Sequence, residues 1–369
     1  MKDIPLVDLS IPHKRLGPAI LAAIEELVAD SDFIGGKRLK RFEAEFAVFT
    51  GARFAVGVSN GTSAIALALK ANGIGPGDEV ITVAHTFIAT AEAILDAGAV
   101  PVFVDVDPVS GLITADNVLA KVTSNTRAVL PVHLYGHPVD LSAISRLCSE
   151  RGLRLIQDAA QAHGALWNGK PLSAFGEAQT YSFYPGKNLG AWGDAGDIVT
   201  DDEAVADRLR SLRDHGRRSG EKYLHHDISA NHRMDPIQAV VLSHKLTELG
   251  AGNARRRDLF HFYSKCLNGI GDISVVAPLE KSTAVHHLLV IRSEAREELR
   301  TFLKEKGIAT GIHYPIPLHK QPAFARFLPL SLPNTERLCP EILSLPFYPD
   351  ISQEQVMHIS NAVREFFRK

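Results

Sequence analysis

The chain has few of the residues that build disulfide frameworks and zinc sites. Its 369 residues include three cysteines, Cys148, Cys266 and Cys339, and no pair of them has CxxC spacing. Disulfide-rich domains and structural zinc sites both need cysteines that are abundant or closely spaced. The sequence therefore predicts a protein of a reducing compartment, with neither a disulfide framework nor a cysteine-based zinc site.

The chain also lacks the motifs and the charge excess of several binding classes. It contains 16 histidines but no HxH or HExxH sequence, so we expect no metal site. The formal net charge is −2, which provides neither the basic surface of a nucleic-acid-binding protein nor an acidic tail.

Long hydrophobic runs are absent as well. The most apolar stretch, residues 87–104, is interrupted by Glu92, Asp96 and Gly98, so it is too broken to span a membrane. Residues 1–5 do not have the apolar core of a signal peptide. These absences predict a cytoplasmic protein whose partners are neither membranes nor nucleic acids.

Strand and helix patterns alternate through the first 160 residues. With 45% hydrophobic and 22% charged residues, the chain has the composition of a globular enzyme with a large core. The alternation predicts an α/β fold with a mainly parallel sheet. The predicted strands are residues 54–58, 79–83, 100–104, 128–134 and 153–157, and the helices between them are residues 64–72, 88–97, 115–122 and 141–150.

A glycine-rich break marks the predicted domain boundary. Residues 236–249 and 253–267 have helical patterns, and Gly250, Ala251 and Gly252 separate them. The later segments alternate between helix and strand over a shorter length. The sequence thus predicts a large domain of residues 1–249 and a smaller α+β domain of residues 250–369.

One lysine stands out in the segment of residues 181–190. Lys187 follows a Pro-Gly turn, and Asp158 ends an apolar strand. A carboxylate there is costly unless it pairs with a cation. We interpret Lys187 as the covalent anchor of pyridoxal 5′-phosphate (PLP) and Asp158 as the partner of its ring nitrogen, with Gln161 near the ring hydroxyl. Two alternatives stand beside this interpretation. Most lysines in proteins are solvated surface residues, and Asp158 taken alone is equally well explained as the N-cap of a helix from Ala159 onward.

A phosphate site is predicted where the strand of residues 54–58 enters the next helix. Gly61 permits close approach of the backbone, Thr62 and Ser63 add hydroxyl groups, and a helix N-terminus attracts anions. The alternative is that Thr62 or Ser63 only caps the helix. Ser182 adds another hydroxyl, and Phe87 is placed to stack on the ring, although a single phenylalanine is more often a core residue.

Several histidines follow predicted strands or lie in later loops. At these positions they are candidates for polar contacts with a substrate. They are His85, His133, His163, His313 and His319.

Five segments resemble, in the same order, motifs of the DegT/DnrJ/StrS family of PLP-dependent sugar aminotransferases. This resemblance covers nearly the whole chain and implies the aspartate aminotransferase fold, known as fold type I. The segments are residues 59–64 (phosphate loop), 77–90 (ring stacking), 158–164 (ring nitrogen), 182–190 (lysine) and 231–235 (contact with the partner subunit).

The resemblance implies a role for each of the candidate residues. Lys187 would bind PLP covalently and move protons, Asp158 would pair with the ring nitrogen, and Gln161 would pair with the ring oxygen. Phe87 occupies the position of the family's stacking aromatic residue. The phosphate would be held by Gly61, Thr62, Ser63 and Ser182.

The resemblance also implies a homodimer and a pair of small-molecule substrates. Asn231 would reach across the interface and join the phosphate site of the partner subunit. L-Glutamate would donate the amino group, and a nucleotide-linked keto-sugar would accept it. Basic residues of the loop 213–222 would meet the diphosphate, unless that loop is simply solvated.

The substrate subclass is implied by a shorter pattern. Gln161 and His163, within Asp-x-x-Gln-x-His-Gly, resemble family members that act at C3 of a dTDP-3-keto-6-deoxyhexose. The same comparison implies substrate contacts from His85, His163, Tyr184, His313, Tyr314 and His319. Two alternatives stay open: a C4 keto-sugar, a cyclitol or another ketone as acceptor, or a catalytically silent PLP-binding regulatory homologue.

Overall fold

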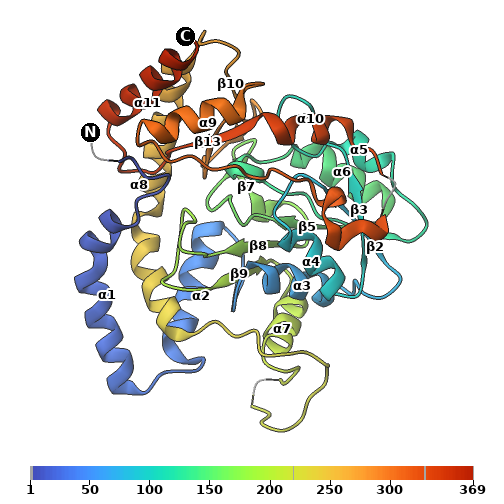
Figure 1. Cartoon of the computed structure of the whole chain (residues 1–369). Helices are drawn as coiled ribbons and strands as arrows, with labels where there is room; N and C mark the ends of the chain where they lie inside the picture. Colours follow the sequence, from blue (N-terminus) through green and yellow to red (C-terminus); the bar gives the residue numbers. More distant parts are fainter. Residues whose placement is uncertain (1–2, 219, 328–329, 369) are drawn as a thin grey trace.

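We describe a computed structural model of the chain, which covers residues 3–218, 220–327 and 330–368 (Figure 1). A seven-stranded sheet forms its centre, in the order β1-β9-β8-β5-β4-β2-β3. The five strands from β8 to β3 are parallel, and β9 is antiparallel to both of its neighbours. The strands are β1 (Phe54–Val58), β2 (Glu79–Val83), β3 (Val100–Val104), β4 (Thr126–Val129), β5 (Arg154–Asp158), β8 (Ala178–Ser182) and β9 (Gly196–Thr200).

Helices cover both faces of this sheet. One face packs against α3, α4 and α7, and the other packs against α2, α6 and the first half of α8. The predicted α/β fold with a mainly parallel sheet is therefore confirmed. The helices of this part are α2 (Gly36–Thr50), α3 (Gly61–Ala71), α4 (Ala89–Asp96), α5 (Ala115–Leu119), α6 (Leu141–Arg151), α7 (Glu203–Leu212) and α8 (Pro236–Leu267).

The C-terminal part has its own antiparallel sheet, in the order β10-β12-β13. Helices α9 and α11 and the second half of α8 pack with it around a separate hydrophobic core. Ile4 also belongs to this core, so the N-terminal segment packs against the C-terminal part (Figure 1). The elements are β10 (Ser274–Val275), β12 (Leu289–Arg292), β13 (Ile342–Leu345), α9 (Arg296–Glu305), α10 (Pro333–Glu341) and α11 (Gln353–Phe366).

Smaller elements complete the chain. Helix α1 (Ser10–Asp30) runs beside α8, as Figure 1 shows. A three-stranded sheet joins β6 (Leu166–Trp167), β7 (Lys170–Pro171) and β11 (Ser282–Thr283), and the short 3-10 helices are Leu134–Gly136, Leu172–Ala174, Leu318–Lys320 and Pro322–Phe327. Within the described residues, no helix combines the length and the apolar character needed to cross a membrane.

The predicted break at residues 250–252 is wrong as a helix boundary. Helix α8 runs through Gly250 and Gly252 without interruption. Two glycines cost about 1 kcal/mol each in a helix, but tertiary burial on both sides outweighs this cost: Leu246 and Leu249 pack in the sheet core, and Leu259 packs in the C-terminal core. The division into residues 1–249 and 250–369 stays a prediction, and its boundary falls inside this helix.

Strand direction brings the candidate site residues together. Because β1 is antiparallel to β9 and β9 is antiparallel to β8, β1 runs parallel to β8, and the carboxyl ends of β1, β2, β5 and β8 meet at one edge. Asp158 is the last residue of β5, and the segments that follow β1, β2 and β8 carry Gly61, Phe87 and Lys187.

Candidate active site

A tight turn after β8 presents Lys187. The Lys187 N–H donates to the Tyr184 carbonyl at 2.8 Å. A Cβ atom at Gly190 would lie 2.2 Å from the Pro185 carbonyl oxygen, so only glycine allows the chain to return this closely. The Pro-Gly turn seen in the sequence is thus a closed loop that fixes the backbone of Lys187.

The Lys187 side chain is half-buried, and its amine has no partner in the described part of the chain. Among the described residues the amine makes no hydrogen bond and no ion pair. Burial lowers the pKa of Lys187 from 10.5 to about 8, while the charge of Asp158 acts to raise it. An appreciable fraction of the amine is therefore unprotonated near neutral pH, as a nucleophile or a base requires.

Asp158 is the buried carboxylate of the site, with 5% of its surface exposed. Its Oδ2 accepts a hydrogen bond from the Thr90 hydroxyl at 2.8 Å, and its Oδ1 accepts one from the Ala160 N–H at 3.1 Å. Burial raises the pKa of Asp158, and the Thr90 bond and the charge of Lys187 partly oppose that rise. A turn follows Asp158 rather than a helix, so the N-cap alternative is wrong.

The N-terminus of α3 stands against the end of β8. A Cβ atom at Gly61 would lie 2.7 Å from the Ser182 Cβ, so glycine permits this approach. The cap of α3 is Asn60, whose side chain accepts the Ser63 N–H at 2.8 Å, so the alternative that Thr62 or Ser63 is the cap is wrong. The Thr62 hydroxyl makes no hydrogen bond to any described residue. A helix N-terminus with a nearby unbonded hydroxyl has the chemistry to bind an anion.

Gln161, Tyr314 and Phe87 form one wall of the site. The Gln161 Oε1 accepts the Tyr135 N–H at 2.6 Å, which leaves Nε2 as a donor near the Tyr314 hydroxyl at 3.4 Å. Phe87 is 54% exposed, and its ring centre lies 5.6 Å from that of Tyr314. The Gln161 amide donates one proton to Tyr314 and has a second to donate, so an exposed aromatic ring beside it suits a planar ligand that carries a ring oxygen.

Three candidate histidines are buried and bonded to the protein itself. His85 Nε2 lies 2.8 Å from the Tyr135 hydroxyl, His133 Nε2 lies 2.9 Å from Gln157 Oε1, and His319 Nε2 lies 3.0 Å from Glu336 Oε1. All three rings are at most 1% exposed. The structure gives these three rings contacts within the protein, and their contacts with a substrate stay predictions.

The other candidates for substrate contact differ in accessibility. Tyr184 is largely exposed beside the Lys187 turn. His313 is partly buried, and its Nδ1 lies 2.8 Å from the Ser344 Oγ. His163 is fully buried between Tyr181 and Phe183, and neither ring nitrogen has a hydrogen-bond partner among the described residues. Burial and the charge of Lys187 lower the pKa of His163 to about 3, so the ring is neutral.

Asn231 is exposed in a segment that lies along its own phosphate loop. The Ser59 N–H donates to the His232 carbonyl at 2.8 Å, and Val58 and Arg233 form an isolated bridge. Within its own chain, the Asn231 Oδ1 accepts a hydrogen bond from the Arg233 N–H at 3.3 Å.

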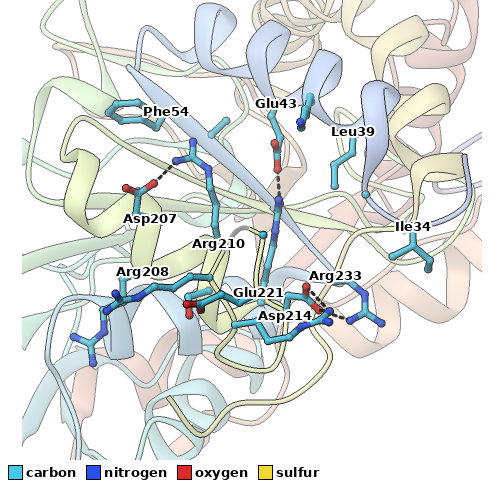
Figure 2. Close-up of a pocket in the computed structure, with 18 of the residues that line it drawn as sticks. Ile34, Leu39, Glu43, Phe54, Asp207, Arg208, Arg210, Asp214, Glu221 and Arg233 are labelled. Atoms are coloured by element: carbon cyan, nitrogen blue, oxygen red, sulfur yellow. Dashed lines mark hydrogen bonds and ion pairs between the residues drawn. The ribbon is translucent and has the colours of Figure 1, made fainter. Parts of the chain in front are cut away.

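The basic loop predicted to meet the diphosphate lines a separate cavity of about 1460 Å³ (Figure 2). The cavity lies between α2, α7, β1 and the segment 213–233, and Figure 2 shows its ion pairs. Arg233 pairs with Asp214 at 2.5 Å, and Arg213 pairs with Glu43. Its lining includes neither Lys187 nor Asp158, so within one subunit the loop and the amine face different spaces.

Sequence reasoning missed the residues that anchor the lysine turn. Asn188 Nδ2 donates to Asn253 Oδ1 at 3.1 Å and to the Val285 carbonyl at 3.0 Å, and Asn188 Oδ1 lies 3.1 Å from His287 Nδ1. One signal was available, because Asn188 directly follows the lysine. Asn253 had no such signal, because it was simply the first residue of the helix predicted after the glycine-rich stretch.

The residues present fit PLP. The cofactor needs four functions, and the site supplies each: an unpaired amine of lowered pKa, a buried carboxylate, a helix N-terminus with free donors and an exposed aromatic ring.

No group of three or more histidine, cysteine or acidic residues in the described part of the chain could hold a metal ion.

Comparison with known families decides the kind of protein. A profile of the DegT/DnrJ/EryC1/StrS aminotransferase family matches residues 14–364. The chain belongs to this family. The family is PLP-dependent in general, and its members have the fold predicted from the sequence.

Relatives of this family member are similar over nearly their whole length. The chain is 45% identical to the pleiotropic regulatory protein of Geobacillus stearothermophilus, covering 99% of each chain. It is 42% identical to the dTDP-3-amino-3,4,6-trideoxy-alpha-D-glucose transaminase of Streptomyces venezuelae, covering 98% and 96%. The crystal structure of S. venezuelae DesV with a ketimine intermediate matches with a TM-score of 0.97 at 41% identity, covering 100% of both chains.

Replacing Thr90 by valine tests the support of Asp158. Valine keeps the shape but cannot donate to the carboxylate, so the pKa of Asp158 should rise further. The variant's carboxyl ionises at a higher pH than the wild-type carboxyl. The charge-dependent part of the loss is therefore absent below the wild-type folded pKa, where both carboxyls are protonated, and complete above the variant's folded pKa, where both are ionised. Denaturation of the apoprotein at neutral pH should show a loss of about 1.5–3 kcal/mol.

Two further variants control this experiment. Thr90→Ser keeps the hydroxyl and should retain most of the stability. In an Asp158→Asn background the cost of Thr90→Val should shrink, because the ionised acceptor is gone. An undiminished cost in that background would contradict a bond to the carboxylate as its cause.

Proposed function

We propose that this aminotransferase uses PLP to move an amino group from L-glutamate to a nucleotide-linked keto-sugar, at C3 of a dTDP-3-keto-6-deoxyhexose. The observation that carries the proposal is the unpaired Lys187 amine opposite the buried carboxylate of Asp158. In the overall reaction, glutamate loses its amino group and becomes 2-oxoglutarate, and the ketone oxygen of the sugar is replaced by that amino group.

The residues of the chain would divide the binding of the cofactor. Gly61, Thr62, Ser63 and Ser182 surround the expected phosphate position at the N-terminus of α3. Asp158 would hold a proton on the ring nitrogen, Gln161 Nε2 would donate to the ring oxygen, and Phe87 would cover one face. When bound, PLP supplies an electron sink for the carbon that loses a proton.

Lys187 would perform the proton transfers. Its lowered pKa of about 8 leaves the amine able both to take a proton from the donor carbon and to return it. Asp158 sets the balance, because its negative charge prevents the pKa of Lys187 from falling further. Asn188 and its partners Asn253 and His287 would keep the lysine turn in place.

The sugar substrate would enter beside the exposed residues of the site. Tyr184, His313 and Tyr314 lie on the segments around Lys187 and are our candidates for its contacts. The relative from S. venezuelae named as a dTDP-amino-sugar transaminase, at 42% identity over 98% of this chain, supports this acceptor class.

A second candidate function is a regulatory, PLP-binding protein without catalysis. The name of the relative from G. stearothermophilus, a pleiotropic regulatory protein, favours it. Against it stands the presence of Asp158 beside Lys187. Covalent binding of PLP needs only the lysine, whereas a carboxylate at the ring nitrogen serves the electron sink of catalysis. Such a protein would bind PLP, but L-glutamate would leave the bound cofactor unchanged.

Amine transfer can be measured directly. The purified protein with PLP should be yellow, lose that colour with L-glutamate, and then aminate a dTDP-3-keto-6-deoxyhexose, as read by product mass spectrometry. Lys187→Ala should lower the rate of transfer by at least about 10³-fold, because it removes the base. The matched control is Lys170→Ala, at an exposed lysine of β7. Undiminished transfer by Lys187→Ala would refute the assignment.

We further propose that the enzyme is a homodimer in which Asn231 completes the phosphate site of the partner subunit. Its exposure and its place beside the α3 N-terminus support this arrangement. Asn231→Ala should weaken PLP binding by about tenfold, the loss of one hydrogen bond to a charged group. Equilibrium titration of the apoenzyme measures this change.

Mixed dimers separate action across the interface from action within one chain. A subunit with Lys187→Ala and a subunit with Asn231→Ala form one dimer that contains one intact site only if Asn231 acts in trans. We expect transfer activity to reappear when the two inactive or weakened variants are mixed and reassembled. No gain over the separate variants would argue that Asn231 acts within its own chain.

A further inference from the structure

The Ser63 hydroxyl lies at the end of a chain of hydrogen bonds in the first turn of α3. Asn60 Nδ2 donates to Ser59 Oγ at 3.3 Å, and the Ser59 hydroxyl donates to Ser63 Oγ at 3.0 Å. The Asn60 Oδ1 accepts the Ser63 N–H at 2.8 Å, so the Asn60 side chain both caps the helix and donates the first hydrogen bond of this series.

His232 approaches the same hydroxyl from the segment 213–233. Its Nδ1 lies 3.0 Å from the Ser63 Oγ. Its backbone is held on both sides, because its carbonyl accepts the Ser59 N–H at 2.8 Å and its N–H donates to the Arg213 carbonyl at 2.9 Å. Arg213 in turn is fixed by Glu43 and by the Gly57 carbonyl. The ring is therefore a fixed part of the loop next to α3.

The tautomer of His232 decides where the Ser63 proton points. A serine hydroxyl has one proton to donate and two lone pairs that accept. If Nδ1 of His232 carries no proton, Ser63 must donate to it. If Nδ1 carries the proton, then Ser59 and His232 fill both lone pairs of Ser63, and its proton is free to point elsewhere.

We propose that His232 is a positioning residue, which donates from Nδ1 to Ser63 and so directs the Ser63 proton toward the phosphate of the cofactor. This inference rests on the proposed function, in which the N-terminus of α3 holds that phosphate. An anion at this turn favours donors that face it, and hydrogen bonds to a charged acceptor are the stronger kind. Asn231, the preceding residue, serves the partner subunit in the proposed dimer, so adjacent residues of one segment act on two cofactor sites.

The experiment compares two ligands that differ only in the phosphate. The apoenzyme is titrated with pyridoxamine 5′-phosphate and with pyridoxamine, neither of which forms a covalent bond with Lys187. His232→Ala should weaken binding of the phosphorylated ligand by about tenfold, the loss of one charge-assisted hydrogen bond, and leave pyridoxamine binding unchanged. A purely structural role would weaken both ligands alike, and that result would overturn the proposal.

Conservative variants sharpen the comparison. His232→Asn places an amide N–H near the position of Nδ1 and should retain binding within about twofold. His232→Gln places its amide near the position of Nε2 and should bind both ligands as His232→Ala does. This variant therefore still tests the proposal if His232→Ala does not fold. His226→Ala is the matched control, because this exposed histidine of the same segment contacts Glu221 and not α3.

Two serine and threonine variants separate failure of this inference from failure of the proposed function. In a Ser63→Ala background His232→Ala should have no further effect on the phosphorylated ligand, and an undiminished effect would overturn the role assigned to His232. Thr62→Ala should weaken the phosphorylated ligand alone. If the wild type binds both ligands equally and Thr62→Ala changes neither, the phosphate does not bind at α3, and the proposed site itself is wrong.

Discussion

The attraction between the half-buried amine of Lys187 and the buried carboxylate of Asp158 is the interaction on which the site depends. Each group alone would be costly to bury, and each is held close to the other charge. Burial moves both pKa values toward the neutral forms, and the mutual attraction moves them back. The result is a lysine that can gain and lose a proton near neutral pH, beside a buried carboxylate that a nearby cation stabilises.

The fold supplies this pair by bringing several chain segments to one sheet edge. Lys187 follows β8 and Asp158 ends β5, and these strands are neighbours in the sheet. The turn of residues 59–63, the proposed phosphate turn, follows β1. Rigid supports then fix each group: Gly190 closes the lysine turn, Thr90 holds Asp158, and Asn60 caps α3. His232, from the neighbouring segment 213–233, contacts Ser63 in the proposed phosphate turn, so a segment outside the sheet also helps to shape the site.

The sequence predicted the sheet and its order of elements well, because strand and helix periodicities are local. It also predicted Lys187, Asp158 and Gly61 as parts of one cofactor site, and in the structure the ends of β8, β5 and β1 meet at one sheet edge. It failed at Gly250 and Gly252, where burial on both sides of α8 outweighs local propensity. Tertiary packing of this kind has no local signal.

The histidines show the same limit more sharply. The local sequence around a histidine that follows a strand is the same whether the side chain contacts a substrate or packs in the core. His85 and His319 turned out to be fully enclosed and bonded to the protein. His232, which the sequence did not single out, contacts the phosphate turn from 169 residues away in the chain, and only the structure shows that contact.

The most direct test of the account is the pKa of Lys187 in the apoenzyme. Reductive methylation at a series of pH values, with Lys187 modification quantified by peptide mass spectrometry, reports the fraction of free amine. The account predicts a midpoint at about 8, and a lower midpoint in Asp158→Asn, because the charge of Asp158 raises the pKa of Lys187. A midpoint near 10.5, the ordinary value for lysine, that does not change in Asp158→Asn would contradict it.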